Sequence, residues 1–534
     1  MLNSLTRTRF REGCIIATGS VAILLLVLSL VLLVMFPFLI YPSLVKGQIE
    51  LKEDETGMFE KPTFYWAKPP AKVYYKFNVF NVKNVDETLF RGEKVQVEEK
   101  GPYTFRQRDT KREIHFDKTN VNYKVSKQWV FEKDLSCKNC TEKDTVFLPN
   151  LSLAALRRLL FEHSDAPRFR QVLADMSALF LGIYPYSKVK VMDTLFWGYT
   201  DSMVDFLNSE LKRDIERLIG GPILGFEAPE IDVLGYFPLY NNTDDGVYDA
   251  YTGSDEINNV GLLKKWVGSD SLEWWNSDYA NNLDKTTDAV ISGSFIKNDS
   301  LTMFQSFLCR HFELLSDGEG SVEGINVIKF KPDPQSYNPH KELYSGYQYK
   351  NDEDIDFFPD VCLKPDECEV EGCSDYCKRT NRTLPPGIHQ HVCFPGRRRR
   401  VPFLAFDSLP HFLNSPKNVQ KSIKGLNPDQ KSHDIGMFHI QPTCGSTLKG
   451  QFRNQFNIAV INDQKITTLK HARTSIIPCF WLQLDITLED YAYDFLRTNM
   501  VVVPNVVFCL GIISFVLGLL VPITVGFIQR HKRK

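Results

Sequence analysis

The chain has 534 residues, a formal net charge of −2 and 43% hydrophobic residues. This hydrophobic fraction excludes an intrinsically disordered chain. The balanced charge argues against a nucleic-acid-binding protein, which would usually be basic. Because no repeat with a period of about 20–50 residues and no Gly/Ser-rich or Pro-rich linker divides the chain, we expect one large domain between its two apolar ends.

A charge-free apolar run from residue 15 to about residue 40 predicts a membrane-spanning helix, since about 20 apolar helical residues cross a bilayer. Arg7, Arg9 and Arg11 precede the run, so residues 1–14 are predicted to be a cytoplasmic tail. A cleaved signal peptide is the alternative, but the run is too long for one and no small-x-small cleavage site follows it. Cys14 is a candidate for palmitoylation or, equally, a buried thiol.

Period-two patterns in the long segment that follows predict β-strands. Val73, Tyr75, Phe77 and Val79 alternate with polar or less apolar neighbours, which is typical of a half-buried strand. A second clear pattern comprises Phe452, Phe456, Ile458 and Val460. Shorter patterns recur at 95–97, 326–330 and 401–406. Most of this segment is therefore predicted to be a β-rich body.

Between about 150 and 220 the apolar period becomes helical and predicts a small bundle. Asp165 and Pro167 are plausible start residues of the second helix, Asp201 is a plausible N-cap of the third, and Gly220 a plausible end. The fold class is therefore predicted to be α+β. The apolar faces of the three helices comprise Leu153, Leu156, Leu159 and Leu160; Phe169, Val172, Leu173, Met176, Leu179 and Phe180; and Met203, Phe206, Leu207, Leu211, Ile215, Leu218 and Ile219.

A second charge-free apolar run, 501–528, predicts a second membrane-spanning helix. The basic residues of the 529–534 tail favour the cytoplasm, so we expect both termini there. Residues 41–500 would then form an extracellular or lumenal ectodomain. Ten cysteines in this segment allow full pairing in an oxidising compartment, but their spacing does not fix the pairing. The candidate disulfide residues are Cys137, Cys140, Cys309, Cys362, Cys368, Cys373, Cys377 and Cys393, and the other two cysteines are Cys444 and Cys479. Five of them define a Cys-rich loop, 362–393.

Five Asn-x-Ser/Thr tripeptides in the same segment are candidate glycosylation sites, although the tripeptide often arises by chance. They are Asn139, Asn150, Asn241, Asn298 and Asn381. A disulfide at Cys140 would hinder modification of Asn139, because Cys140 is the middle residue of that tripeptide.

Cations gather in and beside the predicted helical block and suggest a docking patch for an anionic ligand. They are Arg157, Arg158, His163, Arg168, Arg170, Lys188 and Lys190. Glu162, Asp165 and Asp175 lie among them and weaken the field, so solvated helix faces are the alternative interpretation.

The sequence offers little sign of catalysis or metal binding. The spacing His389-x-His391-x-Cys393 resembles a metal motif, but a structural zinc site needs four ligands, and an oxidising compartment favours disulfides. No Gly-x-Ser-x-Gly, P-loop or His-Glu-x-x-His motif is present. We therefore expect no metal site, no cofactor and no enzymatic activity. The four consecutive arginines 397–400 predict an exposed loop, with proteolytic processing as the alternative.

Five ordered strings resemble the signatures of the class B scavenger receptor family. They are Gly101-Pro-Tyr-Thr-Phe-Arg106, the segment 195–201, the Asn-Asn-Thr loop 240–248, the block 408–413 followed by 425–428, and the segment 477–481. The resemblance extends from the first apolar run to the second.

The resemblance implies an irregular antiparallel β-barrel with a helical bundle at its apex and an apolar tunnel leading toward the membrane. It implies that Cys309 pairs with Cys393, and it implies ligands among lipids, fatty acids, lipoproteins, phospholipid surfaces or a protein bound at the helical apex. The loop holding Cys362, Cys368, Cys373 and Cys377 is longer than in typical members, so the pairing of those four stays open.

These features favour a plasma-membrane receptor that takes up or transfers lipid. A lysosomal membrane protein that exports lipid or carries an enzyme is one alternative, although the 529–534 tail lacks an acidic dileucine signal. An adhesion or scaffolding receptor without lipid transfer is the other.

Overall fold

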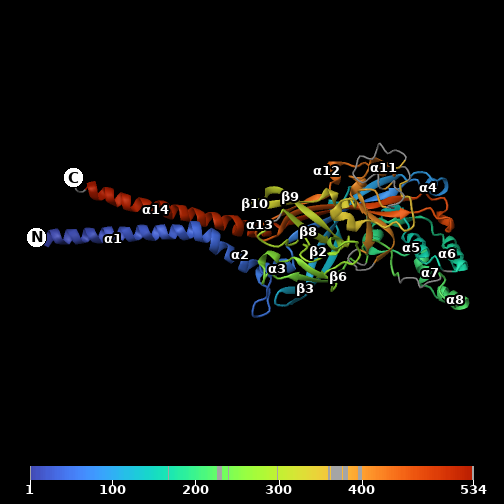
Figure 1. Ribbon diagram of the computed structural model, residues 1–534, viewed down its shortest axis with the longest axis horizontal. Coiled ribbons are helices and arrows are strands. Elements are labelled where there is room, and N and C mark those ends of the chain that lie inside the picture. The colour runs from blue at the N-terminus through green and yellow to red at the C-terminus, as the bar shows by residue number, and fades with distance from the viewer. Residues whose placement is uncertain are drawn as a thin grey trace.

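The computed structural model describes residues 2–165, 167–224, 231–238, 240–297, 299–358, 361–362, 376, 383–394 and 400–531, except for the side chains of residues 2–12, 14, 15 and 529. A mixed body of strands and helices lies at one end of the molecule, and two long helices leave it side by side at the other end (Figure 1). The predicted α+β class is confirmed.

Among the described residues, thirteen strands form one antiparallel sheet. Its path is β7-β6-β3-β2-β1-β15-β14-β13-β10-β9-β8, with β12 paired to β14 and β11 paired to β12. The strands are β1 (Ala71–Val82), β2 (Val97–Phe116), β3 (Asn120–Phe131), β6 (Thr243–Tyr251), β7 (Leu263–Trp266), β8 (Ser300–Gln305), β9 (Arg310–Val322), β10 (Ile325–Pro332), β11 (Ile388–Cys393), β12 (Arg400–Ser408), β13 (Gly436–Ile440), β14 (Thr447–Val460) and β15 (Ser475–Leu488).

The expected β-barrel is not closed by strand pairing in the described part of the chain. The two edge strands, β7 and β8, do not pair with each other. Instead, consecutive residues of one connecting segment reach both edges through single bridges, Thr286 to Leu263 of β7 and Thr287 to Met303 of β8. The expectation of a barrel is therefore corrected to a curled sheet whose edges are linked by an irregular segment.

The strands at the centre of the sheet are more deeply buried than their sequence pattern predicts. β1 and β14 lie where period-two alternation predicts strands, and β15 pairs with both. Nearly every residue of β14 from Phe452 to Val460 is buried on both faces. Phe456 and Ile458 belong to one hydrophobic cluster, whereas Ala459 and Val460 belong to a second cluster that also contains apolar residues of helix α5 (Leu151–Glu162). β14 is thus a buried core strand rather than the half-buried strand expected.

The helical block lies at the end of the body farthest from the terminal helices, as the predicted apical bundle requires (Figure 1). It comprises α5, α6 (Arg168–Phe180), α7 (Ser202–Leu207) and α8 (Glu210–Ile219), with a two-stranded sheet of β4 (Thr145–Pro149) and β5 (Tyr186–Lys190) beside it. The predicted cap is confirmed, since the Asp201 carboxylate accepts from the Met203 and Val204 N–H groups. The predicted third helix is in fact two helices, because Ser209 caps α8 separately.

The two terminal apolar runs form continuous helices that are long and apolar enough to cross a membrane, at Ile16–Ile49 and Asp490–Ile528. The first consists of α1 (Leu2–Leu30), a π-helical segment (Val31–Ile40) around Pro37, and α2 (Tyr41–Ile49). The second consists of α13 (Asp490–Arg497), a π-helical segment (Thr498–Val502) and α14 (Val503–His531). Both helices extend beyond the predicted spans 15–40 and 501–528.

Small residues allow the two terminal helices to pack closely. A Cβ built on Gly511 would lie 2.6 Å from the Leu33 side chain, and one on Gly518 would lie 2.9 Å from Leu26. Such close approach at small residues is typical of helix pairs in membranes. Because the helices run together from the same end of the body, both termini lie on the same side of any membrane that they cross.

Shorter helices complete the described body. α3 (Lys61–Ala67) lies near the terminal helices, and α4 (Val85–Arg91) lies toward the apical end (Figure 1). The others are α9 (Asp278–Asn281), α11 (Lys417–Gln420) and α12 (Gln430–His433).

Candidate functional site

A large cavity opens where the terminal helices join the body and extends into the curled sheet. Its volume is about 1170 Å³, which exceeds the roughly 300–1,000 Å³ of typical small-molecule sites. At the membrane end its walls include Phe36 and Val503 of the two terminal helices, and its inner end includes Phe307 and Phe438. The sequence could not identify these positions, because they come from distant segments of the chain.

Strand alternation directs a band of polar residues into this otherwise largely apolar cavity. Gln107, Asp109 and Lys111 are alternate residues of β2, so they share one face of the strand. All three line the cavity, together with Lys127 of the neighbouring strand β3. The sequence carried one signal of this band: polar residues recur at alternate positions in the segment that forms β2.

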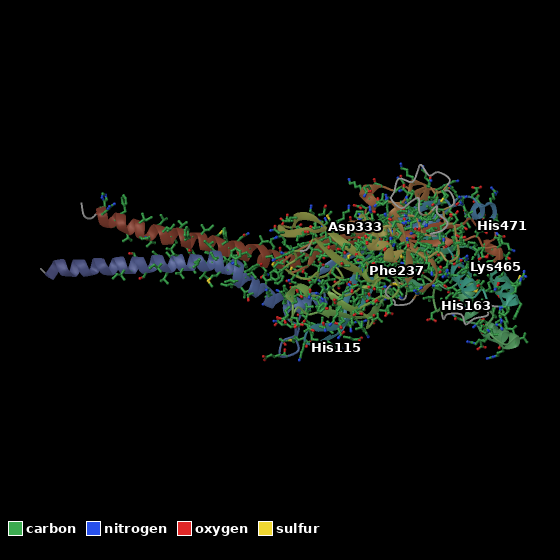
Figure 2. The ribbon with its side chains drawn as sticks, in the orientation of Figure 1. His115, His163, Phe237, Asp333, Lys465 and His471 are labelled. Carbon is green, nitrogen blue, oxygen red and sulfur yellow. A yellow bond between two sulfur atoms is a disulfide. The ribbon has the colours of Figure 1, made fainter. Side chains whose placement is uncertain are left out.

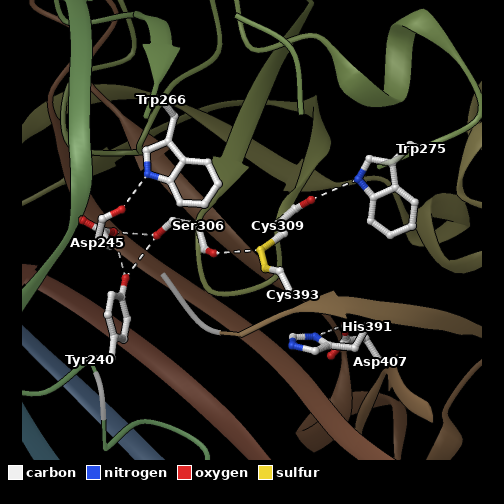
Figure 3. Close-up of a disulfide and its surroundings, with 9 residues drawn as sticks. All are labelled: Tyr240, Asp245, Trp266, Trp275, Ser306, Cys309, His391, Cys393 and Asp407. Carbon is white, nitrogen blue, oxygen red and sulfur yellow. Dashed lines mark hydrogen bonds and ion pairs between the residues drawn. A yellow bond between two sulfur atoms is a disulfide. The ribbon is translucent and has the colours of Figure 1, made fainter. Parts of the chain in front are cut away.

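Asp245 neutralises one cation of the polar band through a buried network. The Lys127 ammonium lies 2.8 Å from Asp245 Oδ2, and the hydroxyls of Tyr240, Tyr248 and Ser306 donate to the same oxygen at 2.9, 2.6 and 2.8 Å. Figure 3 shows part of this network. Burial acts to lower the pKa of Lys127, but the Asp245 carboxylate outweighs it, so the pKa lies well above its usual value. Lys127 therefore stays charged and paired.

A second buried network lies beyond Phe307, at the far side of the inner wall of the cavity. His391 Nδ1 lies 2.8 Å from Asp407 Oδ2, and the Asn454 amide donates to Asp407 Oδ1 at 2.9 Å. His391 and Asp407 are drawn in Figure 3. They border a pocket of about 20 Å³ that shares Phe307 with the large cavity. This pocket has room for about one water molecule, which is too small for a lipid. The residues around it therefore close the inner end of the large cavity.

Two of the predicted apical cations are structural rather than available to a ligand. Arg157 forms an ion pair with Glu353 and a second with Asp463 at 3.3 Å. Arg158 pairs with Glu353 at 2.6 Å and with Glu162 at 2.7 Å. The pKa of Arg158 is raised, because these carboxylates outweigh the effect of burial. Arg157 and Arg158 therefore fix α5 to the body, and their expected docking role stays a prediction.

The remaining predicted cations are dispersed over the apical end. His163 and Arg168 are exposed near the connection between α5 and α6, and Figure 2 shows His163 at this end of the molecule. The Arg170 guanidinium donates to the Pro222 carbonyl. Lys188 and Lys190 are exposed on β5, and Lys190 pairs with Asp193 at 3.6 Å. Arg168 and Lys188 are the members that remain most open to an anionic ligand.

The apolar face of α6 was expected to be core but is largely exposed. Phe180 is 92% exposed, and Phe169, Val172 and Met176 are each more than half exposed. The buried residues of α6 are instead Ala174 and Ala178. Leu218 of α8 is 86% exposed nearby in the same helical block. Exposed apolar surface of this kind marks an interaction site more often than a solvated face.

The described cysteines confirm one expected pairing and show a second. Cys309 is bonded to Cys393, the pair that the family resemblance implies, and Cys137 is bonded to Cys140. Cys393 is thereby removed from the metal-like His389-x-His391-x-Cys393 spacing. Cys362 is also disulfide-bonded. Cys368, Cys373 and Cys377 lie outside the described residues, as does the Cys14 side chain. Cys444 and Cys479 are buried free thiols.

The candidate glycosylation sites differ in accessibility. Asn139 is exposed, and Asn241 is half-buried with its amide oxygen accepting from the Trp129 N–H. Asn150 is buried and its side chain caps α5 by accepting from the Leu153 N–H, which leaves no room for a glycan there. Asn298 and Asn381 lie outside the described residues, as do arginines 397–399.

Comparison with known proteins identifies the family. A model of the CD36 family matches residues 20–529. An uncharacterized protein of Caenorhabditis elegans is 30% identical over 477 residues, covering 88% of each chain. Lysosome membrane protein 2 of the mouse is 26% identical, with 93% of each chain covered. Scavenger receptor class B member 1 of cattle is 23% identical, covering 95% of this chain and 88% of that one. The chain belongs to the CD36 family, which confirms the resemblance to class B scavenger receptors.

Proposed function

We propose that this chain is a plasma-membrane receptor, with both termini in the cytoplasm, that binds lipids or lipoproteins and passes lipid between its cavity and the bilayer. The cavity carries this proposal: its volume of about 1170 Å³ suits a lipid, and residues of both terminal helices form its walls at the membrane end. Free fatty acids and phospholipid surfaces are the other lipid forms that such a site suits. No step of this process requires a cofactor or a catalytic group.

A cavity-blocking variant tests lipid transfer. Val73 and Tyr74 are neighbours on β1 and therefore point to opposite faces of the sheet, and only Val73 lines the cavity. Val73→Trp should abolish uptake of a fluorescent lipid by cells that express the chain, whereas Tyr74→Trp should leave uptake unchanged. Mass spectrometry of lipids that copurify with each variant provides the second measurement.

Equal uptake by the two tryptophan variants, at equal surface expression, would contradict transfer through the cavity. The adhesion or scaffolding alternative would then be favoured. Labelling intact cells with a membrane-impermeant reagent tests the assigned compartment, since a lysosomal chain would be labelled weakly.

A protein ligand at the apex is a second candidate function, and the exposed apolar face of α6 favours it. Phe180 projects this face into solvent, with Arg168 on the first turn of the same helix. Carriage of an enzyme as cargo to the lysosome would use such a surface. Phe180→Ser should weaken binding of a protein ligand while lipid uptake continues, whereas loss of both activities would indicate a general folding defect.

A further inference from the structure

Lys111 is a buried lysine in the large cavity that forms no ion pair with a carboxylate of the described residues. Its side chain is 7% exposed, and it lines the cavity. Its ammonium donates to the Trp66 carbonyl at 3.0 Å and lies over the rings of Trp66 and Tyr123. No ion pair joins it to any carboxylate among the described residues. A lysine ammonium has three donors, so two of them are left for a partner inside the cavity.

The two carboxylates that act most strongly on Lys111, Asp288 and Asp109, accept hydrogen bonds from other groups. Asp109 accepts two hydrogen bonds from the Gln107 amide, at 2.8 and 2.7 Å. Asp288 accepts from the Val290 N–H at 2.9 Å. The Gln107 carbonyl oxygen is buried without a hydrogen-bond partner. The polar band therefore presents one unpaired cation and one unpaired acceptor.

The contrast between the two inward-facing lysines shows that the fold does not neutralise every cation in this cavity. Lys127, on the adjacent strand β3, has Asp245 at 2.8 Å and tyrosine rings and hydroxyls around that carboxylate. Lys111 contacts two aromatic faces and one carbonyl, and it forms an ion pair with neither Asp288 nor Asp109. Burial therefore lowers the pKa of Lys111, although both carboxylates act in the opposite direction. An unpaired buried ammonium is costly in free energy, and a ligand anion beside it would remove much of that cost.

We propose that Lys111 binds the anionic headgroup, a carboxylate or a phosphate, of a lipid whose apolar chain occupies the rest of the cavity. This inference rests on the proposed lipid-binding function and names the headgroup that the site selects. The Gln107 carbonyl, four residues from Lys111 on the same strand, would accept from a hydroxyl elsewhere on such a lipid. Burial also raises the pKa of Asp109, which reduces the repulsion that this neighbour would exert on an anion.

The test compares a carboxylate with its ester on the full-length chain in nanodiscs. The probes are a long-chain fatty acid with a fluorophore at its methyl end and the methyl ester of the same molecule. The wild-type chain should bind the acid at least about 10-fold more tightly than the ester, a difference of ~1.4 kcal/mol. Lys111→Met should abolish this preference and leave ester binding unchanged, and Lys111→Arg should retain it.

Lys118→Met is the matched control. Lys118 lies in the exposed turn between β2 and β3 and does not line the cavity, so this variant should keep the wild-type preference. Ester binding by Lys111→Met also reports that the variant has folded, because the ester uses the same apolar walls.

Four outcomes would overturn the inference. Equal binding of acid and ester by the wild-type chain, or a preference that persists in Lys111→Met, would show that Lys111 does not bind the headgroup while lipid binding itself stands. Failure to bind either probe would overturn the proposed function together with the inference. Displacement of the acid by inorganic phosphate alone, at equal ionic strength, would assign Lys111 to a free anion instead of a lipid.

Discussion

Acidification from about pH 7 to about pH 5 should destabilise the folded body through histidines that are buried in the neutral form. His311 is 1% exposed; its Nε2–H donates to the Tyr279 carbonyl at 2.5 Å, and Nδ1 has no partner. His433 is 8% exposed, and its Nδ1 accepts from the Asp429 N–H at 3.0 Å. Protonation would place a new N–H without an acceptor in the first ring and remove the acceptor in the second.

The pKa values give the direction and size of the effect. Burial, followed by a neighbouring cation or histidine, lowers the pKa of His311 and of His433 from 6.5 to about 4. Between those values the unfolded chain binds more protons than the folded chain, so stability falls as the pH falls. At pH 5 each histidine lowers the free energy of unfolding by about 2 kcal/mol relative to neutral pH, and the pair by about 4 kcal/mol. Burial also lowers the pKa of His389, so protonation of this residue adds to the stability that is lost on acidification.

Thermal unfolding of the full-length chain in nanodiscs, at one scan rate, measures this loss. The decrease in melting temperature on acidification should be smaller for His433→Gln and for His311→Gln than for the wild type. His471, exposed at the apical end (Figure 2), provides the control His471→Gln, which should match the wild type. If all three variants lost as much as the wild type, the neutral state of the buried rings would be wrong. The raised pKa of Asp109 acts in the opposite direction but cancels in this comparison.

Three further perturbations test the forces that hold the fold together. Replacing Cys309 and Cys393 by serine opens a link across a sequence separation of 84 residues, and should lower the free energy of unfolding by about 4.5 kcal/mol, measured by thermal unfolding. Glu353→Gln should cost about 3–5 kcal/mol by leaving two arginines without their shared carboxylate. Gly518→Leu should separate the terminal helices, because even a Cβ there lies 2.9 Å from Leu26; energy transfer between dyes on the two tails would report it.

Each of these three perturbations has a matched control in the chain. The Cys137–Cys140 link spans only 3 residues, and its removal should cost about 1.6 kcal/mol by the same loop-entropy argument. Glu162→Gln removes an exposed partner of Arg158 and should cost under about 1 kcal/mol. Gly526 has no atom within 4 Å of its Cβ position, so Gly526→Leu should leave the helix pair intact. A control that matched its test variant would contradict the corresponding argument.

Local sequence patterns predicted strands and helix ends well where neighbouring residues alone determine the backbone conformation. Alternation located β1 and β14, and Asp201 and Gly220 were correctly expected at the start of α7 and the end of α8. The break at Ser209 was missed because an apolar helical stripe runs across it, while the serine hydroxyl caps a new helix by accepting from the Lys212 N–H.

The candidate site depended on contacts that the sequence does not reveal. Arg157 and Arg158 looked like a docking patch because their carboxylate partners are remote: Glu353 is 195 positions from Arg158, and Asp463 is 306 positions from Arg157. The apolar stripe of α6 satisfied the pattern of a core-facing helix, yet the body contacts the alanine side of that helix. The amphipathic pattern of a helix identifies its apolar face, but it does not show whether the protein body packs against that face.

If the chain transfers lipid as proposed, the position of the cavity mouth gives the two terminal helices a part in that transfer as well as in anchoring. Tyr41 donates a hydrogen bond to the Asn499 carbonyl at 3.0 Å, which joins the ends of the two helices beside the opening. Phe36 and Val503, from the two helices, line the cavity at the same level. A lipid that leaves by this route passes between apolar helix surfaces toward the bilayer, so its chain need not be exposed to water, and the free energy of hydrating that chain does not enter the barrier. If Lys111 binds the headgroup as proposed, the free energy of separating the anionic headgroup from Lys111 adds to the barrier that the lipid crosses when it leaves.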